Sequence, residues 1–567
     1  MPRYQVPLQE IRSALVCCGA LEDVDAATLD AVLDEAARFA ERELASCYRD
    51  GDREGCRLYQ GEVTTPPGFY EAYRAFCEGG WPGLAQSEVY GGQGLSLSVH
   101  MAVYEMLVSA NLSWALYPTI TWGAIATIAA HGSAEQREHY LPRLVSGEWT
   151  GTMCLTESHA GSDLGLLRTR ARPAGDGSYA ISGTKIFISS GEQDLTDNIV
   201  HLVLARLPDA PAGTGGISLF IVPKVLATGE RNTVTCGGIE AKMGIHGNAT
   251  CTLNFDAATG YLVGAPNRGL AAMFTFINES RVEVCLQAQG QMERAYQASL
   301  AYACERKQMR SSPRWDAGQP ADPIIVHADV QRLLLTQRSF SEAARLFSYE
   351  LAALLQVSRH GKPNEAAMAE RQLAFLTPIA KGFISECAQE ATSHAIQVFG
   401  GHGFITETGV EQLYRDVRIT AVYEGTTAIQ GVDLLTRKLL ADNGEQLHRW
   451  TAEMCRQVAD EDTLPVRVLV AIDEWRTLAT YVLEQIGDDP HALNMAAVPF
   501  LMYSGYVISA WLLLRAFLLE TDETSTGRRL ESLRFYLDHI LPRTSALAAS
   551  IYAGAPQAFT ELSALEC

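Results

Sequence analysis

The chain has 567 residues, which is enough for several domains with substantial hydrophobic cores. Hydrophobic residues make up 47% of it and charged residues 20%, the proportions of an ordinary globular protein. The formal net charge of −21 argues against a nucleic-acid-binding protein, which usually carries a basic surface, and against docking on an anionic membrane through bulk charge.

The 13 cysteines are scattered and form neither a Cys-x-x-Cys spacing nor a Cys/His cluster. This distribution predicts reduced thiols and no bound metal. Residues 1–7 contain no apolar signal core, so we expect a cytoplasmic protein rather than a secreted one.

Residues 1–150 are predicted to be helical. Apolar residues recur at helical spacing between positions 25 and 44, and residues 101–128 are apolar and poor in glycine. The Gly91-Gly92-Gln93-Gly94 segment predicts a loop between helices. Because no strand precedes this segment, it does not form a dinucleotide-binding fingerprint.

The periodicity changes after residue 150. Four short β-rich segments lie at 179–182, 199–204, 217–222 and 250–255, separated by Gly, Pro and Asp clusters. Such a pattern is typical of an antiparallel sheet or a small barrel.

Long helical patterns return after the β segments and continue to the C-terminus, interrupted by a polar loop at 310–323. The order predicts a mainly α protein with a central antiparallel β domain. We expect four domains: an N-terminal helical domain (1–150), the β domain (151–265), a helical bundle (266–440) and an extra C-terminal helical domain (441–567).

Residues 491–514 contain no Asp, Glu, Lys or Arg, and about 20 apolar residues suffice to span a bilayer. However, Pro499, Ser504, Gly505 and Ser509 interrupt this stretch, and Arg515 follows it directly. We therefore expect a buried pair of helices in the C-terminal domain. Contact with a membrane surface is the second alternative, and a true span is the third.

Four motifs carry the chemical information. In chain order they are Met153-Cys154-Leu155-Thr156-Glu157-Ser158-His159-Ala160-Gly161-Ser162-Asp163, Gly183-Thr184-Lys185-Ile186-Phe187-Ile188-Ser189-Ser190-Gly191, Gln397-Val398-Phe399-Gly400-Gly401-His402-Gly403-Phe404 and Tyr423-Glu424-Gly425-Thr426. Together, these segments resemble the acyl-CoA dehydrogenase family over roughly residues 30–440. The opening Tyr4-x-x-Pro7-Leu8-x-x-Ile11-Arg12 and the extra C-terminal helices resemble a longer subfamily, which includes 3-methylmercaptopropionyl-CoA dehydrogenase and bacterial long-chain acyl-CoA dehydrogenases.

The resemblance implies FAD-dependent α,β-desaturation of an acyl-CoA thioester to a trans-2-enoyl-CoA, with electrons passed to an electron-transfer flavoprotein. Glu424 is the implied catalytic base, and burial in an apolar stretch would raise the pKa of a Glu toward the working pH. Some relatives carry the base on the helix at 276–281, just before the Arg. That position is Ser280 here, and Glu279 lies about 100° around the helix from it.

The resemblance also implies binding residues. Main-chain groups and side chains of the first two motifs would hold the flavin, Arg306 would meet the FAD pyrophosphate, and the third motif would contact the FAD of a neighbouring subunit. The implied cofactor-binding residues are Met153, Leu155, Thr156, Gly161, Ser162, Phe187, Ile188, Ser189, Arg306, His327, Gln397, Phe399, Gly400, Gly401, Thr426 and Ala428. The implied substrate-binding residues are Ser162, Asn278, Arg281, Tyr423 and Gly425.

A role in fatty-acid β-oxidation and a homodimer or dimer of dimers follow from the same resemblance. Three alternatives stay open: an acyl-CoA oxidase, a desaturase of a biosynthetic carrier-bound thioester, and a non-catalytic flavoprotein of the same fold. Trp114, Tyr117 and Trp122 are candidates to wall the acyl pocket. No nucleic-acid partner is expected, and peripheral membrane contact is left open.

Overall fold

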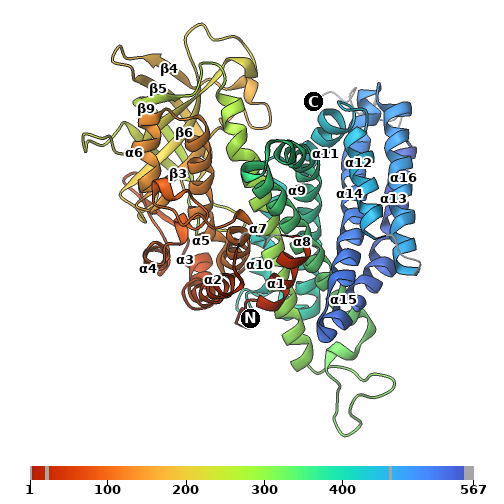
Figure 1. The fold of residues 1–567 in the computed structure, drawn as a ribbon. Helices are drawn as coiled ribbons and strands as arrows, with labels where there is room; N and C mark the ends of the chain where they lie inside the picture. Colours follow the sequence, from red (N-terminus) through yellow and green to blue (C-terminus); the bar gives the residue numbers. More distant parts are fainter. Residues whose placement is uncertain (1–2, 20–23, 459–462, 555–567) are drawn as a thin grey trace, which may run out of the picture. The chain divides into compact units, whose positions relative to one another are not determined.

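The structure, a computed structural model, describes residues 3–19, 24–458 and 463–554 (Figure 1). The chain forms two compact units. The N-terminal unit comprises residues 26–283, and the C-terminal unit comprises residues 1–25 and 284–567. Helix α7 (Gly269–Glu305) crosses the boundary between these ranges.

Helices occupy the first half of the N-terminal unit, as predicted. They are α2 (Ala26–Phe39), the π-helical turn η1 (Ala40–Leu44), α3 (Ala45–Glu54), α4 (Phe69–Glu78), the 3-10 turns η2 (Trp81–Gly83) and η3 (Glu88–Tyr90), α5 (Leu97–His131) and α6 (Ala134–Val145). Ser133 caps α6 through a capping box, in which its hydroxyl accepts from Gln136 N–H and the Gln136 side chain accepts from Ser133 N–H.

The prediction of helices throughout residues 1–150 was wrong at one place. Strands β1 (Arg57–Tyr59) and β2 (Glu62–Thr64) form an antiparallel hairpin. Its two-residue turn has Gln60 at φ +51° and Gly61 at φ +84°. Positive φ at both central positions suits the twist of a tight hairpin, so the local turn conformation decides the structure of this segment.

The second half of the N-terminal unit is a seven-stranded sheet, which confirms the predicted β domain. Its strands are β3 (Trp149–Cys154), β4 (Arg170–Pro173), β5 (Tyr179–Ser189), β6 (Asn198–Arg206), β7 (Ile217–Pro223), β8 (Val234–Ile239) and β9 (Thr250–Val263). The pairings β6–β4, β4–β5, β5–β9, β9–β7 and β7–β6 close a ring, to which β3 and β8 are added. Most pairings are antiparallel, but β3 and β4 each run parallel to β6. Two 3-10 turns, η4 (Leu164–Leu166) and η5 (Thr214–Gly216), lie in the connecting loops.

Helix α5 provides the core of the helical part of this unit and packs against β3. The Trp114 indole N–H donates to the Phe69 carbonyl (3.1 Å), and the Trp122 indole N–H donates to the Pro82 carbonyl (3.0 Å). The Tyr117 hydroxyl donates to the Gly247 carbonyl (3.1 Å). All three aromatic side chains are buried, so they are core residues of the N-terminal unit.

The C-terminal unit consists of helices joined by loops, and the loop 306–323 contains an isolated β-bridge between Lys307 and Pro323. Besides α7, its elements are α1 (Leu8–Cys17), η6 (Ile324–Val326), α8 (Ala328–His360), α9 (Pro363–Phe399), η7 (Gly400–Gly403), α10 (Val410–Val417), η8 (Arg418–Ala421), α11 (Thr427–Val432), η9 (Asp433–Leu439), α12 (Glu445–Gln457), α13 (Thr463–Tyr481), η10 (Val482–Ile486), α14 (Pro490–Leu519), α15 (Glu523–Phe535), η11 (Tyr536–Ile540) and α16 (Arg543–Tyr552). Figure 1 shows α12, α13, α14 and α16 running side by side. The four proposed domain boundaries stay a prediction.

Helix α14 contains the apolar stretch 491–514. Among the described residues it is the one helix long and apolar enough to cross a membrane, and 83% of its most apolar window is buried in the protein. It packs against α8, α9 and α11 as well as α13, α15 and α16. The predicted burial is confirmed. The predicted pair of helices is wrong, because α14 continues through Pro499 without a break.

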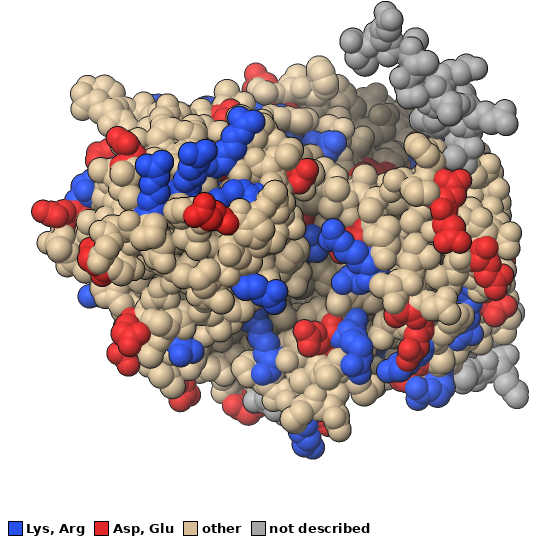
Figure 2. Space-filling view, turned by 90° about the horizontal axis from the view of Figure 1, so that it is seen from above, with Lys and Arg blue, Asp and Glu red and all other residues tan. Residues whose placement is uncertain are grey.

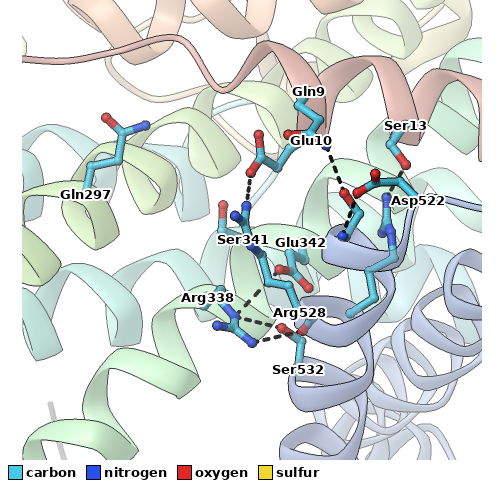
Figure 3. A network of polar contacts seen from close by, with 12 residues as sticks. Gln9, Glu10, Ser13, Gln297, Arg338, Ser341, Glu342, Asp522, Arg528 and Ser532 are labelled. Atoms are coloured by element: carbon cyan, nitrogen blue, oxygen red, sulfur yellow. Dashed lines mark hydrogen bonds and ion pairs between the residues drawn. The ribbon is translucent and has the colours of Figure 1, made fainter. Parts of the chain in front are cut away.

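Residues near the N-terminus pack in the C-terminal unit (Figure 3). On α1, Gln9 donates to Ser525 (3.0 Å), Glu10 pairs with Arg528, and Ser13 donates to Glu520 (2.7 Å). These contacts join α1 to α15 and to the residues just before it. Segments separated by about 500 positions in sequence therefore support the same helical bundle.

The close packing of α14 predicts that one methyl group added at Gly505 lowers the stability of the protein. An added Cβ at Gly505 would lie 2.2 Å from Phe383 Cγ on α9. We expect Gly505→Ala to lower the free energy of unfolding by about 1–3 kcal/mol, since extra methyl groups overpack a dense core. The measurement is chemical denaturation of the purified protein.

Gly527→Ala is the matched control. Gly527 is exposed on α15 and has no atom within 4 Å of its added Cβ, so alanine should leave stability unchanged or raise it by roughly 0.5–1 kcal/mol. Equal stability of wild type and Gly505→Ala would contradict the observed packing.

Candidate functional site

The loop after β3 contains the first motif. Its turn is closed by two main-chain hydrogen bonds, Glu157 N–H to Ala160 O and Ala160 N–H to Glu157 O, both 3.0 Å long. Ile186 N–H on β5 donates to Thr156 O (2.9 Å). Ser158 is exposed at the tip of the turn. The loop is therefore attached to β5 just before its turn, and Ser158 does not participate in that attachment.

A buried ion pair fixes the same loop. Lys185 on β5 is fully buried and donates to Leu155 O (2.8 Å) and to Glu157 Oε1 (2.9 Å). Glu157 also accepts from Arg168 N–H (2.7 Å), Thr169 N–H (3.0 Å) and the Thr169 hydroxyl (2.6 Å). These five hydrogen bonds hold both ends of the loop, because Leu155 lies before the turn and Arg168 after it.

Electrostatics support this arrangement. Burial alone would raise the pKa of Glu157, but the charge of Lys185 and the hydrogen bonds from Thr169 and Arg168 outweigh burial and lower this pKa to about 2. Burial lowers the pKa of Lys185, and the charge of Glu157 opposes that effect. The Glu157 carboxylate is therefore ionised at neutral pH, and its hydrogen bonds join the two ends of the loop.

The implied cofactor side of the loop remains accessible within this unit. The hydroxyl and main-chain N–H of Thr156 have no hydrogen-bond partner in the part of the chain that the structure describes. Gly161 and Ser162 are exposed, and no atom lies within 4 Å of a Cβ added at Gly161. Met153 and Leu155 are half-buried. Donors with open space around them suit the edge of a flavin ring, so these residues fit an FAD.

The second motif places an aromatic ring on the surface of β5. The register between β5 and β9 shifts between Lys185 and Ile188. Within this bulge Phe187 has φ +58° and is 59% exposed. A bulky residue at positive φ is uncommon, and bulges often reorient a side chain beside a functional site. Phe187 and half-buried Ser189 are thus available to a ligand, whereas the Ile188 side chain is in the hydrophobic core.

The fourth motif forms the loop between η8 and α11 in the C-terminal unit. Half-buried Glu424 has φ +54°, and Gly425 has φ +95°. Lys381 on α9, which is fully buried, donates to Gly425 O (2.6 Å), and Gln430 on α11 donates to Glu424 O (2.9 Å). Two side chains from different helices thus stabilise a left-handed backbone that is rare for non-glycine residues.

Glycine is required at position 425 by the packing and backbone conformation of the loop itself, as well as by the expected close approach of a thioester. A Cβ at this position would lie 2.7 Å from Gln430 Nε2, and its φ of +95° disfavours any larger residue. Tyr423 donates to Gln287 on α7. Thr426 caps α11 by accepting from Ile429 N–H (3.3 Å), and Ala428 is exposed on the first turn of that helix.

The remaining implied substrate residues lie on the first part of α7, in the N-terminal unit. Asn278 is exposed and Arg281 is half-buried. The alternative bases are buried: Glu279 is 4% exposed and Ser280 is 7% exposed. A buried carboxylate is less accessible to a substrate than half-buried Glu424, so the structure favours Glu424 as the candidate base.

The other implied cofactor residues lie directly after α7, directly before α8 and at the C-terminal end of α9. Arg306 is exposed, and its guanidinium has no partner among the described residues. The His327 ring makes a hydrogen bond to Gln308 O (2.9 Å). The Phe399 ring stacks on Tyr302 with centroids 4.1 Å apart, so Phe399 supports the packing of α9 on α7. Gln397, Gly400 and Gly401 are exposed, and nothing lies within 4 Å of a Cβ added at either glycine.

The sequence reasoning missed Lys185, Glu157 and Lys381 as supporting residues. The signal was available in each case. Lys185 lies four positions after Ile181, so the alternation of a strand places it on the same face as that apolar residue, and Lys381 lies in the apolar stretch 376–384. A lysine at a core position requires an oxygen partner, because an unpaired buried charge is very costly. The described cysteines are free, as predicted, whereas Cys567 lies outside the described residues.

The lowered pKa of Glu157 predicts a pH dependence of stability. In the unfolded chain a Glu titrates near its ordinary pKa of about 4.3. The ionised carboxylate therefore stabilises the folded protein at pH values above about 4.3, and this contribution is lost as the pH falls toward 2. We expect it to be about 2–3 kcal/mol at neutral pH.

Denaturation midpoints of wild type and Glu157→Gln should therefore differ most at neutral pH and converge toward pH 2. Lys185→Met should destabilise by roughly 3–5 kcal/mol, since it leaves a buried carboxylate without its cation. Lys362→Met is the control, because the Lys362 side chain is 85% exposed. If the difference in denaturation midpoint between wild type and Glu157→Gln stays constant with pH, the role given to the Glu157 charge is contradicted.

Comparison with known proteins adds family matches along most of the chain. The acyl-CoA dehydrogenase N-terminal domain matches residues 27–148, the middle domain matches residues 152–258 and the C-terminal domain matches residues 267–439. A further description, acetyl-CoA dehydrogenase C-terminal like, matches residues 445–560.

Individual proteins agree with these matches. The chain is 41% identical to 3-methylmercaptopropionyl-CoA dehydrogenase of Ruegeria pomeroyi, over 94% of each chain. It is 33% identical to the broad-specificity linear acyl-CoA dehydrogenase FadE5 of Mycobacterium tuberculosis, over 91% of this chain and 89% of the other. The structure of an acyl-CoA dehydrogenase complexed with FAD from Bacillus anthracis superposes with a TM-score of 0.78 at 21% identity, covering 96% of this chain and 91% of that one. With a flavin-compatible loop and a Tyr-Glu-Gly-Thr loop already in place, these likenesses show that the chain belongs to the acyl-CoA dehydrogenase family of FAD-dependent oxidoreductases.

Proposed function

We propose that this protein converts an acyl-CoA thioester to its trans-2-enoyl-CoA, with Glu424 as the base, and passes the electrons to an electron-transfer flavoprotein. The observation that carries this proposal is the Glu424 loop. Its carboxylate is half-buried, and its backbone is held at positive φ by Lys381 and Gln430. Such local strain is typical of functional sites.

The chain's own residues have three tasks in this reaction. Glu424 takes the proton from the α-carbon, and the loop at Thr156 and Ser162 binds and orients the cofactor. An FAD held there would supply the acceptor for the hydride of the β-carbon. Asn278 and Arg281 are suitable for binding the CoA part, because one is exposed and the other half-buried on the same helix. Phe187, exposed at the bulge, offers a flat face for packing against a ring.

The names of the relatives suggest which substrates to test. A short thioether acyl-CoA follows from the Ruegeria enzyme, and a linear acyl-CoA series follows from the Mycobacterium enzyme. Bleaching of the flavin under anaerobic conditions reports turnover without a partner protein. Re-oxidation by oxygen as fast as by the electron-transfer flavoprotein would favour the oxidase alternative, and absence of bleaching with every thioester would favour the non-catalytic one.

Removing the base should abolish proton abstraction and leave binding intact. We expect Glu424→Gln to retain FAD and bind acyl-CoA while flavin reduction slows by about 10²- to 10⁴-fold, the usual contribution of general-base catalysis. Stopped-flow absorbance of the flavin measures this rate. Glu279→Gln is the comparison variant. If Glu279→Gln loses the activity and Glu424→Gln keeps it, the base has been assigned to the wrong residue.

The Arg306 assignment is tested through the cofactor. Arg306→Ala should lower FAD occupancy after dilution, because a charged hydrogen bond to a phosphate contributes roughly 1.5–3 kcal/mol. The rate per bound flavin should change much less. Arg371→Ala removes another exposed arginine of the same unit and serves as the control. A full flavin complement in diluted Arg306→Ala would show that this residue does not hold the pyrophosphate.

A further inference from the structure

His246 lies in the β8–β9 loop (residues 240–249), and both of its ring nitrogens face oxygen acceptors. Nδ1 lies 2.9 Å from Asp52 Oδ1 and 3.0 Å from the main-chain carbonyl oxygen of Asp52 on α3. Nε2 lies 2.7 Å from the main-chain carbonyl oxygen of Lys242. A neutral imidazole carries only one N–H, whereas an imidazolium carries two. Only the charged form of His246 therefore satisfies both sides of the ring.

The surroundings favour this charge. The hydrogen bond to Asp52 outweighs the effect of burial and raises the pKa of His246 to about 9. Figure 2 shows many Lys, Arg, Asp and Glu side chains standing at the protein surface, where an ion pair contributes little. By contrast, the Asp52 side chain is only 16% exposed and that of His246 33% exposed. Solvent and salt therefore screen this pair less than a surface pair.

The other titratable groups around the ring are already engaged or neutral. The Lys242 ammonium donates to a main-chain carbonyl of the same loop (2.9 Å). The Cys56 N–H donates to the His246 carbonyl (3.1 Å), and the Cys56 thiol and the Tyr117 hydroxyl both donate to Gly247 O. Burial raises the pKa of Cys56 to about 11 and that of Tyr117 above its ordinary range. Both groups thus stay neutral at the pH where His246 titrates.

The β8–β9 loop is also attached to the end of β5. Ser190 N–H donates to Ala249 O (2.7 Å), and the Asn248 side-chain amide donates to the Ser190 hydroxyl (3.0 Å). The last residues of β5 pair with the first residues of β9, directly after this loop. The segment Phe187–Ser189, proposed above to meet the flavin, is therefore bound to the loop that His246 holds.

The main chain is unfavourable at the point where His246 acts. Ile245, directly before His246, is buried and has φ +49°. A β-branched residue at positive φ persists only where its surroundings hold it. The bonds of the His246 ring to Asp52 and to Lys242 O fix the chain on both sides of Ile245. When His246 loses a proton, one side of its ring has no hydrogen to donate, and the loop loses one of these two attachments.

We propose that His246 is a positioning residue for the flavin contact: protonated between Asp52 and the Lys242 carbonyl, it holds the β8–β9 loop and, through that loop, the segment Phe187–Ser189. Loss of the proton lowers the affinity for FAD. The inference deepens the proposed function, because it rests on Phe187 and Ser189 facing the cofactor. It concerns cofactor binding and not the proton transfer assigned to Glu424.

The affinity for FAD tests this role without turnover. Dilution of the purified, FAD-loaded enzyme, followed by flavin fluorescence, gives the dissociation constant. At neutral pH, His246→Gln should raise this constant about tenfold, the order of one charged hydrogen bond. His246→Arg keeps a cation with several N–H donors and should stay within about twofold of wild type.

His139→Gln is the matched control. His139 is another half-buried histidine of the same unit, on α6, where its ring contacts Tyr140 and Trp149. Burial lowers the pKa of His139, so its ring is neutral at neutral pH. This variant should bind FAD like wild type.

The pH profile separates the positioning role from a purely structural one. Because the pKa of folded His246 is raised, its contribution is present at low pH and is lost as the pH rises through about 9. The wild-type dissociation constant should then rise to that of His246→Gln, whereas His246→Arg should keep its low value. Asp52→Asn should move the wild-type transition down toward about pH 6.5, the ordinary pKa of a histidine.

Three results would overturn the inference. They are equal FAD affinity of wild type and His246→Gln at neutral pH, a difference between them that stays constant as the pH rises through about 9, and a loss in His246→Arg equal to that in His246→Gln. If His246→Gln does not fold, the pH profiles of wild type, His246→Arg and Asp52→Asn decide by the same criteria. If wild type binds FAD but turns over no thioester, the proposed reaction fails, and the FAD affinities still decide the role of His246.

Discussion

The buried pair of Lys185 and Glu157 is the interaction on which the geometry of the N-terminal unit's candidate site depends. Two charges removed from water are stable only when they are paired and hydrogen-bonded. Here the ammonium group reaches a carboxylate and a main-chain carbonyl, while the carboxylate accepts from two main-chain N–H groups and a hydroxyl. Because these partners lie before, within and after one turn, satisfying the charges also fixes the loop.

The Glu424 loop is stabilised in a similar way, because a buried lysine again donates to a main-chain carbonyl. Lys381 donates to Gly425 O, and Gln430 donates to the preceding carbonyl. A Glu at positive φ is unfavourable by itself, so the surrounding helices must stabilise it. Phe187 on β5 also has a positive φ, and it lies in a bulge that exposes its aromatic ring. The alternation of a regular strand alone would not explain this exposure.

The arginines on and around β4 show that residues of one type can have different surroundings in the same region. The Arg206 guanidinium donates to four carbonyl oxygens of the protein. The guanidinium groups of Arg168, Arg170 and Arg172 make no hydrogen bond within the described chain. Composition conceals this difference, because the protein is acidic overall. Local charge, set by the alternation of side chains along β4, decides which ligands the surface attracts.

The sequence by itself determined the order of helical and β regions, because hydrophobic periodicity and Gly, Pro and Asp clusters are local properties. It also determined the family, through four motifs whose residue types are fixed by the chemistry they serve. It did not reveal the hairpin at 57–64 or the continuity of α14 through Pro499. The two-residue turn is a local conformation that hydrophobic periodicity does not encode, and the continuity of α14 accompanies its packing against several other helices. Only the tertiary structure showed that Trp114 and Trp122 are core residues, that Phe399 stacks on Tyr302, and that Lys185 and Lys381 hold the two candidate loops. Each of these facts concerns which partner a side chain finds across the fold, and burial makes that partner obligatory for a polar group.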